Sequence, residues 1–273
     1  MPTYQHDELS NADYHAHSAL SRSALLSFSQ SPAHFWQRYL SSQNVAKAPT
    51  PAMLFGSALH SFVLEPDRYN LDYLELPGGS RASTAARVIQ EKAAAEQSVV
   101  LPHGTTAKCH AMSKALMGHK AASKALTTAG QNEASFFATC PKTDLEVKCR
   151  ADRLTNKGWV VDLKTTICAA PDAFARTIAN YQYHIQAGFY LDVIEWATGH
   201  RPKGFLFVCI EKEAPYAVSV FRASDAMIQA GSKKAQELLH GLADHFLRFG
   251  PEKPWPAYGE SITELDLPTW ARQ

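Results

Sequence analysis

Three charged residues lie close together in the sequence and are of types that catalyse hydrolysis: Asp152, Asp162 and Lys164. In an extended strand alternate side chains share a face, so Asp162 and Lys164 project to the same side. A short turn between two strands can bring Asp152 opposite Asp162, where the carboxylates repel each other unless a cation lies between them. Hard oxygen ligands of this kind suit Mg²⁺ or Mn²⁺ and leave positions for water and phosphate oxygens.

Phosphodiester hydrolysis is the reaction that fits such a site. A metal there lowers the pKa of an attacking water, while Lys164 positions that water or stabilises the transition state. Glu133 lies on the strand expected before this pair and is a third acidic candidate near the same edge. The alternative is that these residues are surface charges in ion pairs worth about 0.5 kcal/mol each. Spacing alone leaves both interpretations open.

Two further sets of side chains also allow a functional and a structural interpretation. Tyr183, Gln186 and Tyr190 are spaced by three and four residues and therefore share one helix face, either at a site or at an amphipathic edge. His60 lies in an otherwise apolar helix, where a histidine is either a hydrogen-bonded core residue or a ligand. The other histidines show no metal-binding spacing, and the common nucleotide-binding and serine-hydrolase patterns do not occur.

The elements that must position these residues follow from the periodicity of apolar residues. From residue 131 onward apolar and polar residues alternate, which predicts a three-stranded meander followed by two more strands. The expected strands are 133–139, 145–154, 158–165, 204–210 and 216–222. The expected helices are two short ones within 11–40, then 53–64, two within 82–129, 171–179, 183–198 and 224–249. Strands mixed with helices predict an α/β class with a mixed central sheet flanked by helices.

Composition indicates one large domain, because 273 residues with 45% hydrophobic content can bury a sizeable core. We expect a mainly helical N-terminal part over 1–130, the catalytic sheet and helix over 131–223, and a C-terminal helix and tail over 224–273. The five cysteines lack Cys-x-x-Cys spacing, which favours reduced, mostly buried thiols over disulfides or a metal cluster. The sequence shows neither a membrane-spanning apolar run nor a signal-peptide pattern, so we expect a cytoplasmic protein without membrane contact.

A net charge of +1 is small for a protein that binds nucleic acid, so any contact with DNA must come from a local arrangement of charges. Lys148, Arg150 and Arg153 are candidates for tracking the phosphate backbone, because they are close to Asp152 in the sequence.

An ordered set of motifs completes the sequence evidence. It consists of Gly56-Ser57-Ala58-Leu59-His60, Glu133, Cys149-Arg150-Ala151-Asp152, Val161-Asp162-Leu163-Lys164-Thr165-Thr166 and Tyr183-His184-x-Gln186-x-x-x-Tyr190. This set resembles the RecE (exonuclease VIII) branch of the PD-(D/E)xK nucleases. Ser31-Pro32-Ala33-His34-Phe35 near the start and Leu267-Pro268-x-Trp270-Ala271 near the end are similar to the same branch, so the resemblance covers nearly the whole chain.

The resemblance implies a restriction-endonuclease-like core and a Mg²⁺-dependent 5′ to 3′ exonuclease. Such an enzyme resects linear double-stranded DNA from its ends and leaves 3′ single-stranded tails for DNA recombination or repair. The resemblance also implies that Asp152 and Asp162 bind Mg²⁺, with His60 and the Leu163 carbonyl completing the shell. Lys164 would assist the nucleophilic water. Gln186 and Tyr190 would orient the substrate, and Glu133 matches the family by its order and by its place at the start of the meander.

The implied partners are DNA ends, a RecT-type single-strand annealing protein and further copies of the chain in a homo-oligomeric ring around DNA. One alternative is a catalytically silent subunit that binds DNA ends or assembles a recombination complex. Another is a nuclease that cuts single strands or works with a helicase, as RecB-type and Cas4-type nucleases of the same superfamily do. The sequence contains neither helicase motifs nor a four-cysteine cluster, which argues against this last class.

Overall fold

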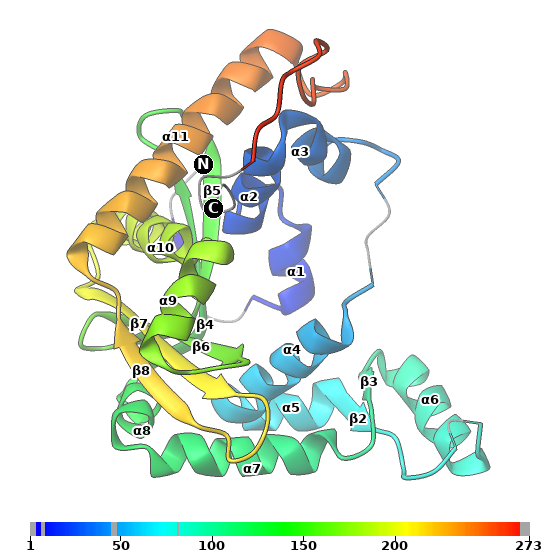
Figure 1. Cartoon of the computed structure of the whole chain (residues 1–273). Coiled ribbons are helices and arrows are strands. Elements are labelled where there is room, and N and C mark those ends of the chain that lie inside the picture. The colour runs from blue at the N-terminus through cyan, green and yellow to red at the C-terminus, as the bar shows by residue number, and fades with distance from the viewer. Residues whose placement is uncertain (1–3, 7–8, 45–47, 81, 268–273) are drawn as a thin grey trace.

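The computed structural model describes residues 4–6, 9–44, 48–80 and 82–267 (Figure 1). Its main sheet has six strands in the order β1-β4-β5-β6-β7-β8. Their bounds are β1 Tyr4–His6, β4 Gly130–Thr139, β5 Glu146–Thr155, β6 Trp159–Thr166, β7 Gly204–Glu211 and β8 Val218–Arg222. Strands β6 and β7 are parallel, whereas the other neighbours are antiparallel. The predicted α/β class with a mixed sheet is therefore confirmed.

The other helices and strands of the described residues are eleven helices and a small parallel pair of strands. The helices are α1 Asn11–Ala16, α2 Arg22–Gln30, α3 Pro32–Tyr39, α4 Pro51–Leu64, α5 Pro66–Asp72, α6 Thr84–Glu96, α7 Thr105–Gly118, α8 Lys120–Thr127, α9 Pro171–Asn180, α10 Tyr183–Thr198 and α11 Asp225–Phe249. The small pair is β2 Tyr73–Glu75 with β3 Val99–Leu101. Figure 1 shows that this pair and α6 project from the sheet as an arm.

The N-terminal half contains more elements than the sequence predicts. Residues 11–40 form three helices instead of two, and residues 82–129 form three helices and a short strand instead of two helices. The break at Ser31-Pro32 is the predicted one, and the additional helix within 11–40 is α1, which Ser10 caps by accepting a hydrogen bond from the backbone of Asp13. Between α7 and α8, His119 accepts a hydrogen bond from the backbone of Ala122. Helix α5 is also additional. It is short and is held by packing of Tyr69, which a local sequence pattern does not reveal.

Two apolar layers enclose the sheet. On one face, α10 packs against β4, β5 and β7, and α2, α3, α9 and α11 complete the main core around it, with Phe35, Phe174, Phe189 and Leu239 fully buried. On the other face, α4, α7 and α8 cover β6 and β7, with Leu59 and Leu163 buried in one apolar cluster. The strands that carry the acidic residues are therefore fixed from both sides.

Helices α10 and α11 cross at backbone contact through two glycines. A Cβ added to Gly188 would lie 2.1 Å from the backbone nitrogen of Ser232, and one added to Gly231 would lie 1.8 Å from the carbonyl oxygen of His184. Any side chain at these positions would push the helices apart. This close crossing fixes the start of α10, which carries Tyr183 and Gln186.

The cysteines agree with the sequence analysis. All five are free thiols; Cys109, Cys140, Cys149 and Cys209 are buried and Cys168 is half-buried. Among the described residues, no helix combines the length and apolar character needed to cross a bilayer. Of the tail motif, Pro268, Trp270 and Ala271 lie outside the described residues.

Candidate metal centre

The acidic residues meet where β5 separates from β6. The two strands pair through Arg153 with Val161 and Leu154 with Val160, so Asp152 and Asp162 would form the next pair. The ladder ends there instead. The backbone N–H of Leu163 then donates to Oδ2 of Asp152 at 2.8 Å. Asp152 and Asp162 therefore lie where the β5–β6 ladder ends.

Glu133, on β4, lies opposite Asp152 of β5 and has an unusual backbone conformation. Its neighbours pair in register with β5, Asn132 with Arg153 and Ala134 with Ala151, which places Glu133 opposite Asp152. Glu133 itself has a φ of 48°, in the left-handed region. This conformation costs a non-glycine residue roughly 1–2 kcal/mol. Strain of this kind is concentrated at functional sites, and here it aims a carboxylate at a second carboxylate.

Helix α4 adds a third ligand to this pair. His60, Glu133 and Asp152 each offer a donor atom, and these atoms all lie within 4.8 Å of one another. Nδ1 of His60 is 3.3 Å from Oδ2 of Asp152. Leu59 and Leu64 of the same helix are buried in the layer that covers β6, which holds His60 against the strand ends. The structure thus brings together three residues that the sequence marked separately.

A second polar group lies directly beside the first, on β6 and α10. Nζ of Lys164 is 2.6 Å from Oδ2 of Asp162, whose side chain is 2% exposed. The side-chain amide of Gln186 donates to Oδ1 of Asp162 at 2.5 Å. Both carboxylate oxygens of Asp162 are therefore engaged by neighbours. These two contacts fix the positions of the Asp162 carboxylate, the Lys164 ammonium and the Gln186 amide relative to one another.

The electrostatics show an excess of negative charge over compensating protein cations. Burial, followed by repulsion from Asp152 and Glu65, raises the pKa of Glu133 to about 8. Burial also raises the pKa of Asp162, against the lowering effect of Lys164. For Lys164, burial alone would lower the pKa, but the carboxylates of Asp162 and Asp152 outweigh it and raise the pKa. Lys164 is therefore a charged ammonium at neutral pH.

The donor set fits a divalent cation. Two carboxylates and an imidazole lie within the span of one coordination shell, and a cation between them relieves the repulsion of the carboxylates. Oε1 of Gln186 is buried without a hydrogen-bond partner in the described part of the chain, which leaves an acceptor free for a bound water or ion. Carboxylate and imidazole ligands together suit Mn²⁺ as well as Mg²⁺.

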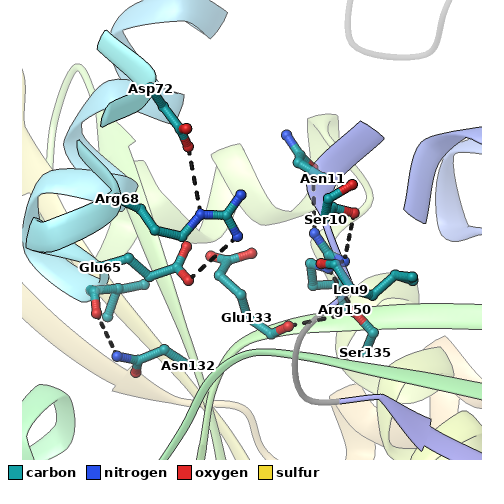
Figure 2. A network of polar contacts seen from close by, with 11 residues as sticks. Leu9, Ser10, Asn11, Glu65, Arg68, Asp72, Asn132, Glu133, Ser135 and Arg150 are labelled. Carbon is teal, nitrogen blue, oxygen red and sulfur yellow. Dashed lines mark hydrogen bonds and ion pairs between the residues drawn. The ribbon is translucent and has the colours of Figure 1, made fainter. Parts of the chain in front are cut away.

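An arginine on α5 lies at the rim of this centre. Figure 2 shows the guanidinium of Arg68 next to the Glu133 side chain, between Glu65 and Asp72. Its ion pairs with Glu65 and Asp72 are long, 3.9 and 3.6 Å. Arg68 lowers the pKa of Glu133 without overcoming the effect of burial. Sequence reasoning missed Arg68 because it missed α5.

The expectation that Lys148, Arg150 and Arg153 track DNA is wrong, because all three are buried and bonded within the protein. Nζ of Lys148 donates to the carbonyls of Tyr14 and His17. The guanidinium of Arg153 donates to Thr128 and Asn132.

Arg150 is held by the N-terminal segment, as Figure 2 shows. Its Nε donates to Oγ of Ser135 at 2.7 Å, and its Nη2 donates to the Leu9 carbonyl at 2.9 Å. The guanidinium also lies 4.3 Å from the centre of the Tyr14 ring. Proximity in sequence to Asp152 did not make Arg150 a surface residue.

The remaining expected site residues occupy α10. Tyr183 contacts Lys164, whose Nζ is 4.9 Å from the ring centre. Tyr190 lies two turns further on, where its ring packs edge-on against Phe205. Of the predicted polar face, Tyr183 and Gln186 touch the acidic group, whereas the Tyr190 ring packs against the core. Leu163 contributes its N–H to Asp152 as described above, and a metal bond from its carbonyl stays a prediction.

The chain is similar to one known protein family and to solved structures. A family model described as "PDDEXK-like domain of unknown function (DUF3799)" matches residues 21–266. A solved structure described as a "Putative exonuclease" from Eubacterium rectale is similar with a TM-score of 0.62 and 14% identity, covering 96% of each chain. At this identity the similarity concerns the fold alone. A second structure, SSO0001, has a TM-score of 0.29 and 13% identity over 68% of this chain and 85% of that one, too low to inform the fold. No curated protein matches.

The family match spans nearly all of the residues that form the sheet and the acidic centre. The predicted superfamily is therefore confirmed, while the RecE branch within it is a finer assignment that these comparisons do not reach. The chain has a mixed sheet, two strands that separate at the acidic residues and a lysine two residues after Asp162. It belongs to the PDDEXK-like family DUF3799 and hence to the PD-(D/E)xK superfamily.

Proposed function

We propose that this protein is a Mg²⁺-dependent exodeoxyribonuclease that resects linear double-stranded DNA in the 5′ to 3′ direction and leaves 3′ single-stranded tails. The observation that carries the nuclease assignment is the convergence of His60, Glu133 and Asp152 within 4.8 Å, next to the Lys164–Asp162 pair. Membership of a PDDEXK-like family supports it. The polarity and the double-stranded substrate rest on the resemblance to the RecE branch.

Each residue of the centre has a separate task in this proposal. His60, Glu133 and Asp152 hold the metal, with Asp162 and the Leu163 carbonyl as further ligands. When bound, the metal lowers the pKa of a water and offsets charge on the scissile phosphate. Lys164, charged because of Asp162, holds the attacking water or stabilises the negative charge of the transition state. Gln186 fixes the Asp162 carboxylate, and Tyr190, packed against Phe205, holds α10 in place so that Gln186 meets Asp162.

Magnesium is the proposed physiological ion, with Mn²⁺ able to replace it. Carboxylates and water suit both ions, whereas the imidazole of His60 is a better ligand for Mn²⁺. We therefore expect Mn²⁺ to bind more tightly than Mg²⁺ and to support cleavage at lower concentration.

The setting of this activity follows from the same resemblance. We propose that residues 1–273 act as one exonuclease domain, that copies of the chain form a ring around DNA, and that a RecT-type annealing protein takes up the 3′ tail during recombination or repair in the cytoplasm. A closed ring would concentrate modest positive charge, which suits a chain with a net charge of +1.

Digestion of end-labelled DNA tests the function. Linear and closed-circular duplexes are incubated with wild-type protein in Mg²⁺, Ca²⁺ or EDTA, and Lys164→Ala is compared with Lys92→Ala, which removes an exposed, ion-paired lysine from α6. We expect loss of linear DNA only, in Mg²⁺ only, unaffected by Lys92→Ala and abolished by Lys164→Ala. Binding of DNA ends without degradation by the wild type would replace the exonuclease with the catalytically silent end-binding subunit.

A further inference from the structure

An exposed tyrosine stacks on the aromatic residue that contacts Lys164. Tyr181 lies between α9 and α10, and its side chain is 63% exposed. Its ring stacks on Tyr183 with a centroid distance of 5.7 Å and an interplanar angle of 19°. One face of the Tyr181 ring is therefore covered by an aromatic neighbour, while much of the rest of the ring is in contact with solvent.

The stack continues inward past the lysine of the site. Tyr183 stacks on the buried Phe207 at 6.2 Å and 30°. Nζ of Lys164 lies 4.9 Å from the centre of the same Tyr183 ring. The aromatic stack thus connects the protein surface to the ammonium that the proposed reaction uses.

A second cation lies along this stack. The guanidinium of Arg22, from the first turn of α2, lies 5.3 Å from the centre of the Tyr183 ring and donates to the carbonyl of Tyr181. Its Nε is buried and has no hydrogen-bond partner among the residues that the structure describes. The Nη2 end of the guanidinium is the exposed part, and a guanidinium is a cation that binds phosphate oxygens.

The backbone holds Tyr181 in place before any ligand arrives. The N–H of Tyr181 donates to the Thr177 carbonyl at 3.0 Å, and the N–H of Gln182 donates to the Ala179 carbonyl at 3.2 Å. Gln182 has a φ of 52°, a left-handed conformation that costs a residue with a side chain roughly 1–2 kcal/mol. A fixed aromatic ring loses little conformational entropy on binding, which favours affinity.

We propose that Tyr181 and Arg22 form a nucleotide-binding platform, on which an unpaired base of the DNA strand stacks against Tyr181 while its phosphate lies near Arg22. Proteins hold single-stranded nucleic acid by this combination of an exposed aromatic ring and adjacent positive charge. The platform rests on the proposed function, because Lys164 at the inner end of the stack is that function's catalytic lysine. Its role is to hold an end nucleotide, separated from its partner strand, beside the acidic centre.

A fluorescent base tests the platform without requiring cleavage. A duplex carrying an unpaired terminal 2-aminopurine is bound to the full chain in Ca²⁺. The readouts are quenching of the 2-aminopurine by stacking and the dissociation constant. For the wild type we expect quenching. Tyr181→Ala and Tyr181→Leu should lose the quenching and bind roughly ten-fold more weakly, because stacking contributes about 1–3 kcal/mol per base. Tyr181→Phe should behave as the wild type.

Tyr258→Ala is the matched control, since Tyr258 is equally exposed, at 69%, in the C-terminal tail, and should leave both readouts unchanged. Equal quenching and equal affinity for wild type and Tyr181→Ala would overturn the platform, as would an absence of quenching in the wild type. Cleavage of the same duplex in Mg²⁺ is measured separately. Quenching without cleavage would support the nucleotide-binding platform and reject the exonuclease activity. Cleavage without quenching would support the exonuclease activity and reject the platform.

Discussion

Strand β5 carries two cations, Lys148 and Arg150, and one carboxylate, Asp152, at alternate positions. The surroundings of the cations differ from those of the carboxylate. The two cations are surrounded by acceptors: backbone carbonyls of the N-terminal segment, the Ser135 hydroxyl and the Tyr14 ring. Asp152 faces Glu133 and His60 and receives one backbone N–H. Buried charges with satisfied hydrogen bonds stabilise the fold, whereas like charges placed close together mark the functional site.

This comparison assigns different consequences to mutations only a few residues apart. Removing a cation should reduce stability, because buried carbonyls lose their donors. Removing a carboxylate should reduce activity and leave stability equal or higher, because a repulsion disappears. Four experiments, from the largest expected effect to the smallest, probe that division.

Asp152→Asn should reduce nuclease activity by about 1000-fold, or ~4 kcal/mol, since the metal contributes several kcal/mol to the transition state. Its melting temperature should equal or exceed that of the wild type. Initial rates on end-labelled linear DNA and thermal melts without metal check both statements. Asp244→Asn, in an exposed position of α11, serves as the control. An active Asp152→Asn variant would remove the acidic centre from catalysis.

Arg150→Met should lower the free energy of unfolding by about 3 kcal/mol, because it leaves buried acceptors without a donor and detaches the N-terminal segment. Urea denaturation measures this change. Activity at low temperature should stay within a few-fold of the wild type. Arg248→Met, at the exposed end of α11, should leave stability unchanged. If Arg150→Met were stable but unable to bind DNA, Arg150 would be a DNA contact after all.

Mn²⁺ at about 100 times its dissociation constant should raise the melting temperature of the wild type by about 5 °C, the shift expected from ~2.7 kcal/mol of binding energy. The same addition should leave Asp152→Asn nearly unchanged. Differential scanning fluorimetry with and without a chelator provides the measurement. A shift of the same size in both proteins would place the ion elsewhere.

Glu133→Gln should raise the stability of the metal-free protein by about 1 kcal/mol, since the charge that burial and Asp152 oppose is removed. It should also weaken Mn²⁺ binding, because an amide is a poorer ligand than a carboxylate. Urea denaturation in a chelator and calorimetric titration with Mn²⁺ give the two values. Lower stability of Glu133→Gln would show that Glu133 is a satisfied structural residue, like Arg150.

The local part of this architecture could be predicted from sequence. The meander and α10 follow from the alternation and periodicity of apolar residues, and the pairing of Asp162 with Lys164 follows from strand geometry. The position of Arg150 could not be predicted, because its partners lie about 140 residues earlier in the chain. The left-handed backbone of Glu133 and the exposure of Tyr181 also depend on tertiary packing, for which no local pattern gives a signal.

The central claim is that Glu133 and Asp152, next to the point where the β5–β6 pairing ends, hold a divalent metal together with His60. Crystals grown with Mn²⁺ and measured at an energy where manganese scatters anomalously test it most directly. The account predicts an anomalous peak about 2.0–2.3 Å from ligand atoms of His60, Glu133 and Asp152. It also predicts that the peak disappears in Asp152→Asn. A site free of anomalous signal at saturating Mn²⁺, or a peak that persists in the variant, would contradict it.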